Sequence, residues 1–177
     1  MPSSRRLITS TTLSSSAASV TFSAIPNTFT DLVLKFSVRS TGGSNTFDHI
    51  NVTFNGDTAS NYSRTYLNGN GAAAASGRST SASLFGMLQA ADGATATSNT
   101  FSNGELYIPS YTASQNKPVS QDSAQETNAT TAYRVVNAGL WRNTSAITSI
   151  ELAVGGSGGS TDFVSGSSFF LYGLFNS

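Results

Sequence analysis

Apolar and polar residues alternate along several stretches of the chain. In the clearest of them, residues 32–39, every second residue is apolar: Leu32, Leu34, Phe36 and Val38. A period of two is typical of a β-strand with one buried and one solvent-facing side. The pattern recurs at Ile50, Val52 and Phe54, and a strong turn signal, Asn55-Gly56-Asp57, follows it.

Similar runs predict nine further strands, and no segment has a convincing helical pattern. Their predicted positions are about 6–13, 17–23, 62–67, 83–89, 104–109, 118–126, 132–142, 147–154 and 168–174. Many short strands separated by turn signals favour an all-β fold, a two-sheet antiparallel β-sandwich of jelly-roll type.

Four stretches between these strands have no apolar period. They are rich in Gly, Ser, Thr, Asn and Ala and are predicted as loops: 40–46, 68–80, 90–100 and 155–161. Ala72–Ala75 could form one short turn, but glycines surround it. We expect an N-terminal arm and first strand in residues 1–16, and a single β-sandwich domain in residues 17–177.

The folded chain is expected to present a polar surface with little charge. Only 10% of the 177 residues are charged, and nine basic and nine acidic residues give a net charge of zero. No basic stripe predicts nucleic-acid binding. The absence of cysteine excludes disulfides and thiolate metal ligands. Since no signal peptide or long apolar segment is found, we expect synthesis in a cytoplasm and no membrane partner.

Reactive side chains are too few to predict a catalytic residue. His49 is the only histidine. The alternative to a catalytic role for it is that of a solvent-facing strand residue hydrogen-bonded to Asp48. Four acids could contribute to a glycosidase pair: Glu105, Asp122, Glu126 and Glu151. An exposed sheet would carry as many isolated acids, so we predict that the protein is not an enzyme.

A metal ion or cofactor is not predicted either. Residues 57–61 offer oxygen ligands, but they lack the ordered acid spacing of a calcium-binding EF-hand loop.

One group of residues could bind a carbohydrate. Trp141, Arg142 and Asn143 follow one another at the end of a predicted strand, and sugars stack on aromatic rings and bond to polar side chains. Leu140 and Trp141 must point to opposite faces, so one belongs to the core and the other to a surface or interface. The pattern leaves open which is which.

Two other groups of residues are candidates for contacts in an assembly. The C-terminal strand is apolar on both faces and includes Phe169, Phe170 and Tyr172, which predicts burial on both sides or against a neighbouring subunit. Near the N-terminus, Arg5 and Arg6 could pair with carboxylates of a partner. The alternative for this segment is a frayed terminus.

Several longer stretches resemble a known group of proteins. They are residues 19–26, 29–34, 52–57 with 61–63, 104–111, 139–144, 147–150 and 163–173. Together they are similar to small virion structural proteins of tailed bacteriophages, of the marine and cyanobacterial phage type. The resemblance covers almost the whole chain and implies a structural component of a virion, on either the head or the tail.

These observations favour a non-enzymatic protein on the virion surface. We expect an oligomeric head decoration or cement protein, a homo-oligomer with a trimer favoured, whose partners are other virion proteins such as capsid or tail subunits. The alternative is a tail-fibre or adhesin module that binds a host surface polysaccharide through loops 40–46, 68–80 and 90–100 and the aromatic residues near them.

Overall fold

The computed structural model describes residues 4–42, 44–128, 131–155 and 161–175, and these residues form strands and no helix. The strands are β1 (Arg5–Thr12), β2 (Ser19–Phe22), β3 (Asp31–Val38), β4 (Phe47–Phe54), β5 (Tyr62–Gly69), β6 (Ala74–Ala82), β7 (Phe85–Asp92), β8 (Ser102–Ile108), β9 (Lys117–Gln125), β10 (Tyr133–Trp141), β11 (Ile150–Gly155) and β12 (Ser168–Leu174).

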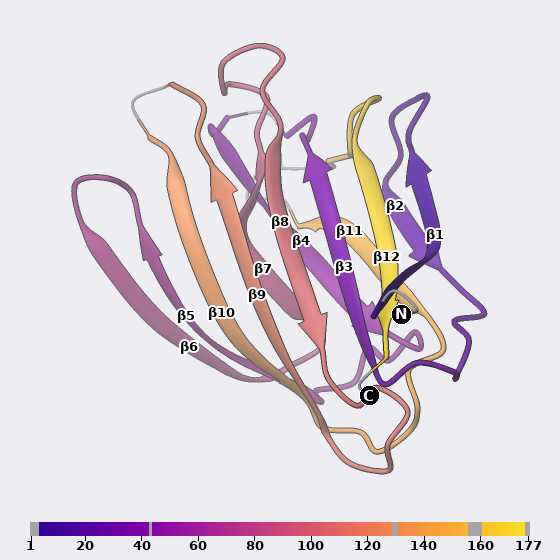
Figure 1. The fold of residues 1–177 in the computed structure, drawn as a ribbon. Coiled ribbons are helices and arrows are strands. Elements are labelled where there is room, and N and C mark those ends of the chain that lie inside the picture. The colour runs from indigo at the N-terminus through magenta and orange to yellow at the C-terminus, as the bar shows by residue number, and fades with distance from the viewer. Residues whose placement is uncertain (1–3, 43, 129–130, 156–160, 176–177) are drawn as a thin grey trace.

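Two sheets pack face to face, which confirms the predicted all-β antiparallel sandwich (Figure 1). The large sheet has eight strands in the order β1-β12-β3-β8-β9-β10-β5-β6, and the small sheet has four in the order β2-β11-β4-β7. All neighbouring strands in both sheets run antiparallel. The jelly-roll type stays a prediction, because two packed antiparallel sheets occur in other sandwich topologies as well.

The predicted alternation determines which face of each strand enters the core. Leu32, Leu34, Phe36 and Val38 of β3 are buried, as are Ile50, Val52 and Phe54 of β4. β3 lies in the large sheet and β4 in the small sheet, so these apolar faces contribute to one core between the sheets. Burial of such side chains is the main stabilising contribution to a sandwich, about 1.5–3 kcal/mol for each.

A close approach between the sheets explains one glycine. Gly139 lies on β10, and a Cβ atom there would be 2.2 Å from the Phe85 ring of β7. Only a residue without a side chain lets this ring pack directly on the backbone of the large sheet.

The predicted loop 68–80 is wrong. β5 continues to Gly69, a turn follows, and Ala74–Ala82 forms β6, which pairs with β5 and ends the large sheet. Asn70 closes the turn, because its Oδ1 accepts hydrogen bonds from the backbone N–H groups of Ala72 and Ala73. An edge strand needs backbone pairing more than apolar side chains, so its sequence carries no alternating pattern.

The predicted loop 90–100 is wrong in part, since β7 extends to Asp92. The remaining residues to 100 form turns around the side chain of Arg39. Its guanidinium donates to the carbonyl oxygens of four of them, Ala94, Ala96, Thr97 and Thr100, at 2.9–3.2 Å. One strand-end arginine therefore fixes the path of the loop. The predicted loop 155–161 lies largely outside the described residues, and Gly155 ends β11.

Candidate functional site

The sandwich is open along the side where β1 and β2 lie. β1 is the last strand of the large sheet and β2 the last strand of the small one, and both are at the right of Figure 1. A hollow of about 390 Å³ separates them, lined by residues 9–11 and 13 next to one sheet and residues 19–22 of the other. A second hollow, of about 270 Å³, lies beside residues 6–8 of β1 and residues 26–29.

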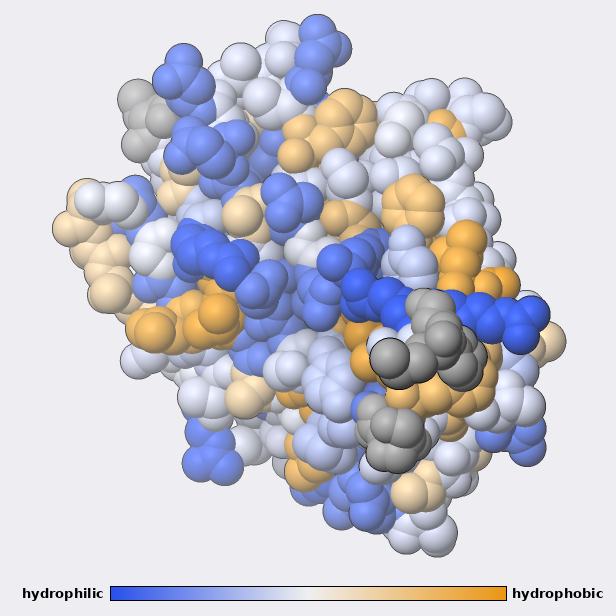
Figure 2. Space-filling view, viewed as in Figure 1, coloured by the Kyte–Doolittle hydropathy of each residue, from blue (hydrophilic) through white to orange (hydrophobic). Residues whose placement is uncertain are grey.

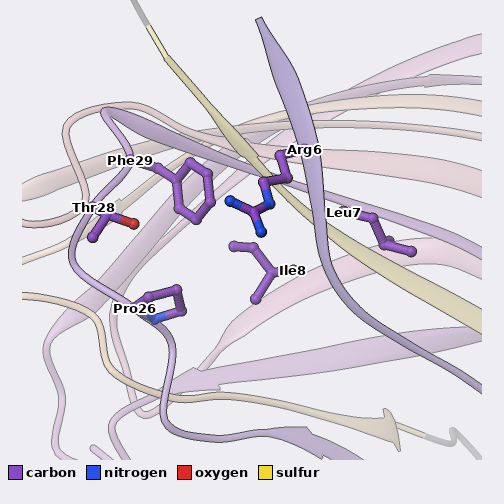
Figure 3. Close-up of a pocket in the computed structure, with 6 residues that line it drawn as sticks. All are labelled: Arg6, Leu7, Ile8, Pro26, Thr28 and Phe29. Carbon is purple, nitrogen blue, oxygen red and sulfur yellow. The ribbon is translucent and has the colours of Figure 1, made fainter. Parts of the chain in front are cut away.

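The second hollow combines a cation with apolar walls (Figure 3). Arg6 and Ile8 point into it, toward Phe29 and Pro26, whereas Leu7 points away from it. Phe29 is fixed in place on both sides: its ring lies 4.8 Å from that of Phe175, and it covers Gly173, where a Cβ atom would be 2.2 Å from the ring. The hollow thus has a rigid apolar wall on one side.

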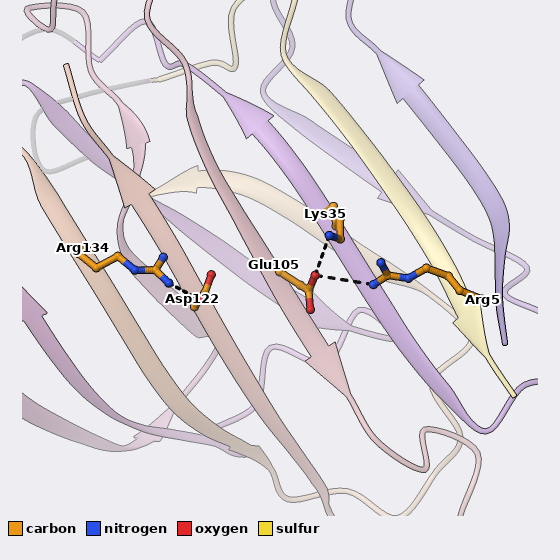
Figure 4. Close-up of polar contacts among 5 residues, drawn as sticks. All are labelled: Arg5, Lys35, Glu105, Asp122 and Arg134. Atoms are coloured by element: carbon orange, nitrogen blue, oxygen red, sulfur yellow. Dashed lines mark hydrogen bonds and ion pairs between the residues drawn. The ribbon is translucent and has the colours of Figure 1, made fainter. Parts of the chain in front are cut away.

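The neighbouring arginine lies on the other face of the large sheet, in a row of charged side chains (Figure 4). Glu105 on β8 forms ion pairs with Lys35 Nζ at 3.1 Å and with Arg5 Nη2 at 3.7 Å. The Arg5 guanidinium also lies 4.9 Å from the centre of the Tyr172 ring. Arg5 is therefore engaged inside the fold and does not extend from it as an arm.

The same row contains a second carboxylate. Asp122 on β9 is directly opposite Glu105 in the β8–β9 pairing, and Arg134 on β10 forms an ion pair with it. Figure 2 shows this face of the large sheet, with a hydrophilic band across it and apolar patches beside the band. The structure thus brings together two of the acids considered for a glycosidase pair, Glu105 paired with Lys35 and Arg5, and Asp122 paired with Arg134.

The other two acids lie elsewhere. Glu126 follows the end of β9 and accepts a hydrogen bond from the backbone N–H of Asn128. Glu151 is exposed on β11 in the small sheet. Neither joins the row of Figure 4.

His49 is half-buried and is not bonded to Asp48, contrary to the alternative considered for it. Its Nδ1 accepts a hydrogen bond from the backbone N–H of Gln89 at 3.0 Å. Burial and, secondarily, the positive charge of Arg64 lower its pKa, which favours the neutral ring. The hydroxyl of Ser40 donates to Asp48 instead, and burial raises the pKa of that acid.

The predicted carbohydrate contact at Trp141 is wrong, because the ring is 0% exposed. It stacks with Tyr62 and packs near Phe54 in the core. Its Nε1 donates a hydrogen bond to Asp57 Oδ2 at 2.7 Å. Trp141 is therefore the core residue of the 140–141 pair.

The two polar residues after Trp141 hold turns in place. The Arg142 guanidinium donates to the carbonyl oxygen of Ser60, and Asn143 Oδ1 accepts from the backbone N–H of Ser145. The Asp57 carboxylate, considered as a metal ligand, accepts hydrogen bonds from Asn61, Trp141 and the N–H of Ala59. In the described chain no group of three or more histidines, cysteines or acids is placed to hold a metal ion.

The C-terminal strand divides its aromatic residues between two environments. Phe169 is 0% exposed and contacts Phe163 in the core, so it cannot contact a partner and that prediction is wrong. Phe170 and Tyr172 point to the outer face of the large sheet, where they are half-buried. Residues of the same chain thus cover much of β12 on both sides.

Sequence reasoning missed a pair of exposed apolar residues. Leu67 on β5 is 52% exposed and Val136 on β10 is 44% exposed, and the two are direct cross-strand neighbours. Leu67 lay at the end of a predicted strand and Val136 inside another, but the pattern gave no sign of which face was outward.

Sequence reasoning also missed a buried polar layer on the inner face of β9 and β10. Gln121, Ser123, Gln125 and Asn137 belong to it. Gln121 Oε1 accepts a hydrogen bond from Asn137 Nδ2, and Gln125 Nε2 donates to the carbonyl oxygen of Thr46.

No helix among the described residues is long and apolar enough to cross a membrane. No model of a known protein family matches the chain, and no curated protein sequence matches it. The resemblance to phage virion proteins therefore stays a prediction.

Proposed function

We propose that this chain is a non-enzymatic structural component of a bacteriophage virion, carried in many copies on the particle surface as a head decoration protein. The observation that supports this best is a contrast between two sets of groups. The side chains considered for chemistry are bonded within the fold, whereas the open side of the sandwich carries strand edges and a cation that nothing in the described chain engages.

The first part of the contrast concerns the reactive groups. His49 accepts a hydrogen bond from the backbone of β7, and the indole of Trp141 donates one to the Asp57 carboxylate. Glu105 pairs with Lys35 and Arg5, and Asp122 pairs with Arg134. Each of these groups thus already has a partner within the fold, which favours a structural role for it over a catalytic one.

The second part concerns surfaces that suit assembly. The outer face of the large sheet exposes Leu67 and Val136, and Phe170 and Tyr172 are half-buried on the same face. Such residues are suited to contacts between copies, and closed symmetry, with a trimer favoured, would repeat them around an axis. A net charge of zero lets many copies lie side by side without strong mutual repulsion.

Purified particles provide the test. An antibody against the chain, labelled with gold, should mark the capsid shell in electron micrographs, and separated heads should contain the chain in a fixed ratio to the capsid subunit. Absence of the chain from purified particles would refute a structural role in the virion. Labelling confined to the tail would refute the decoration role alone.

A tail-fibre or adhesin module that binds a host polysaccharide is the second candidate. A shallow hollow of about 250 Å³ on the outer face of the large sheet favours it, because Glu105, Tyr107, Ser120 and Asp122 line that hollow. These side chains offer a ring and several hydrogen-bonding groups to a sugar.

Glycan-array binding would test this second candidate. Binding by the adhesin should be lost in Asp122→Ala, while Glu151→Ala, on the other sheet, should bind as the unchanged protein does. No binding to any glycan of the host surface would count against it.

A further inference from the structure

We propose that the open side of the sandwich receives an extended, acidic segment of another virion protein, which adds to the free edge of β1 and places a carboxylate on Arg6. This inference rests on the proposed function for the identity of the partner. The geometry of the groove itself does not depend on that function.

The free edge of β1 is the first element of the site. β1 pairs with β12 from Arg5 to Thr12, and no other strand of the described chain pairs with its opposite edge. An unpaired edge presents backbone N–H and C=O groups that an extended segment can bond to. The pairing with β12 shifts between Leu7 and Thr9, so the edge has two parts, with Ile8 between them.

The groove beside this edge is the second element. The two hollows follow one another along β1, the hollow of about 270 Å³ beside residues 6–8 and the hollow of about 390 Å³ beside residues 9–11 and 13. Ile8 and Leu13 pack against the core from this side, and Val20 and Phe22 of β2 belong to the core. The groove therefore has an apolar floor along a strand that spans about 26 Å at the usual rise per residue.

The charge of the groove is the third element. Of the nine basic residues in the chain, seven are bonded to carboxylates or carbonyl oxygens within the fold: Arg5, Lys35, Arg39, Arg64, Lys117, Arg134 and Arg142. Arg6 and Arg78 have no such partner among the described residues.

The two remaining arginines differ in their surroundings. Both are exposed, and Arg78 lies on β6, at the opposite edge of the large sheet. Arg6 points into the hollow of about 270 Å³, over Ile8 and beside Phe29 (Figure 3). None of the residues that line either hollow is acidic. A guanidinium beside apolar walls binds a carboxylate strongly and in a defined geometry, often through two parallel hydrogen bonds.

This sequence carries no acidic residue in a segment that is free to reach a second copy. All nine acidic residues lie in the described strands and their connections: Asp31, Asp48, Asp57, Asp92, Glu105, Asp122, Glu126, Glu151 and Asp162. The occupant is therefore an extended segment of a different subunit, apolar at alternate positions and with an Asp or Glu opposite Arg6.

A binding assay with the whole chain tests the groove. The probe is a short fluorescein-labelled peptide in which valine and threonine alternate around one aspartate, and the matched probe has asparagine in its place. Fluorescence anisotropy should give a dissociation constant for the aspartate peptide that is lower by about tenfold or more. Arg6→Gln should abolish this difference, and Arg78→Gln should retain it.

Amide hydrogen exchange provides a second measurement in the same samples. The aspartate peptide should slow exchange in β1 and leave β6 unchanged, because only one edge is covered. Equal affinity for the two peptides, no binding of either, equal effects of the two arginine variants, or unchanged exchange in β1 would each overturn the inference.

The outcome is separable from that of the proposed function. A chain found on virions that fails the peptide assay would refute the groove and leave the structural role standing. A chain absent from virions that binds the aspartate peptide through Arg6 would refute the virion role and leave the groove standing.

Discussion

Asp57 holds the end of β10 to the turn after β4, and its replacement tests the assignment of Trp141 to the core. The carboxylate accepts three hydrogen bonds: from the N–H of Ala59 at 2.9 Å, from Asn61 Nδ2 at 2.8 Å and from Trp141 Nε1 at 2.7 Å. The hydroxyl of Tyr62 donates to the carbonyl oxygen of Asp57 at 3.0 Å and accepts from the N–H of Phe54. Burial raises the pKa of this hydroxyl to about 12, so it remains a donor.

The expected loss in Asp57→Ala follows from where each donor lies. Ala59 is exposed and Asn61 half-buried, so water can replace the carboxylate there and each bond contributes about 0.5–1 kcal/mol. The indole N–H belongs to a fully buried ring, and leaving it without an acceptor costs about 1–3 kcal/mol. We therefore expect the free energy of unfolding to fall by about 2–5 kcal/mol.

Urea unfolding followed by far-ultraviolet circular dichroism measures this loss. Trp141 is the only tryptophan, so its fluorescence reports separately on water entry at the indole. The matched control is Asp122→Ala, which removes one exposed ion pair and should change stability by about 0–1 kcal/mol. If Asp57→Ala loses less than about 0.5 kcal/mol, as an ordinary surface substitution does, the reasoning is refuted.

The pH dependence of stability provides a second test of the role of Asp57, with a defined direction. Hydrogen bonds from Asn61 and then from Trp141 are the main causes that lower the pKa of Asp57 below its usual 3.8. A lowered pKa in the folded state means that the stabilisation is present above about 3.8 and is lost as pH falls through the folded pKa. Asp57→Asn should weaken this acid dependence.

Three further changes have directions set by the structure. Arg39→Met should lower stability by about 2 kcal/mol and speed hydrogen exchange in residues 93–100, because four carbonyl oxygens lose their donor. Asp92→Asn should be more stable than the unchanged protein at neutral pH and should lose this advantage below about 3.8, because burial raises the pKa of Asp92 and its ionisation is unfavourable in the fold. His49→Gln should reduce the loss of melting temperature below pH 6.5, because burial lowers the pKa of His49 and the folded state resists its protonation.

The sequence predicted elements well where apolar residues alternate. In β3 and β4 the pattern identified the strands and the face that each one buries, since one side of each strand faces the core. In β10 the same parity was not informative, because Trp141 shares a face with Val135 and Leu140 shares the opposite face with Val136. Both faces therefore look apolar in the sequence, and only the structure shows that Val135 and Trp141 are buried.

The pattern fails where burial does not require apolar side chains. β6 is an edge strand of small and polar residues, and it forms through backbone pairing with β5. Gln121 and Asn137 face inward and are joined by one hydrogen bond, yet as polar residues they look outward-facing in the sequence. Local patterns carry no information on which strands become neighbours, and the row of Glu105 and Asp122 depends on that pairing.

The position of Arg6 allows one competing explanation, which makes a different prediction. A charged residue on an edge strand can have the sole role of preventing pairing with another sheet edge. Arg78, at the other edge of the large sheet, fits that role. If Arg6 had the same role, Arg6→Gln and Arg78→Gln would promote self-association to a similar extent, as measured by light scattering. A recognition role predicts asymmetry, because Arg6 lines an apolar hollow together with Ile8 and Phe29, whereas Arg78 is exposed on the edge strand β6. Arg6→Lys separates the two roles further: it retains the charge that repels an edge, and it loses the planar group that holds a carboxylate through two bonds.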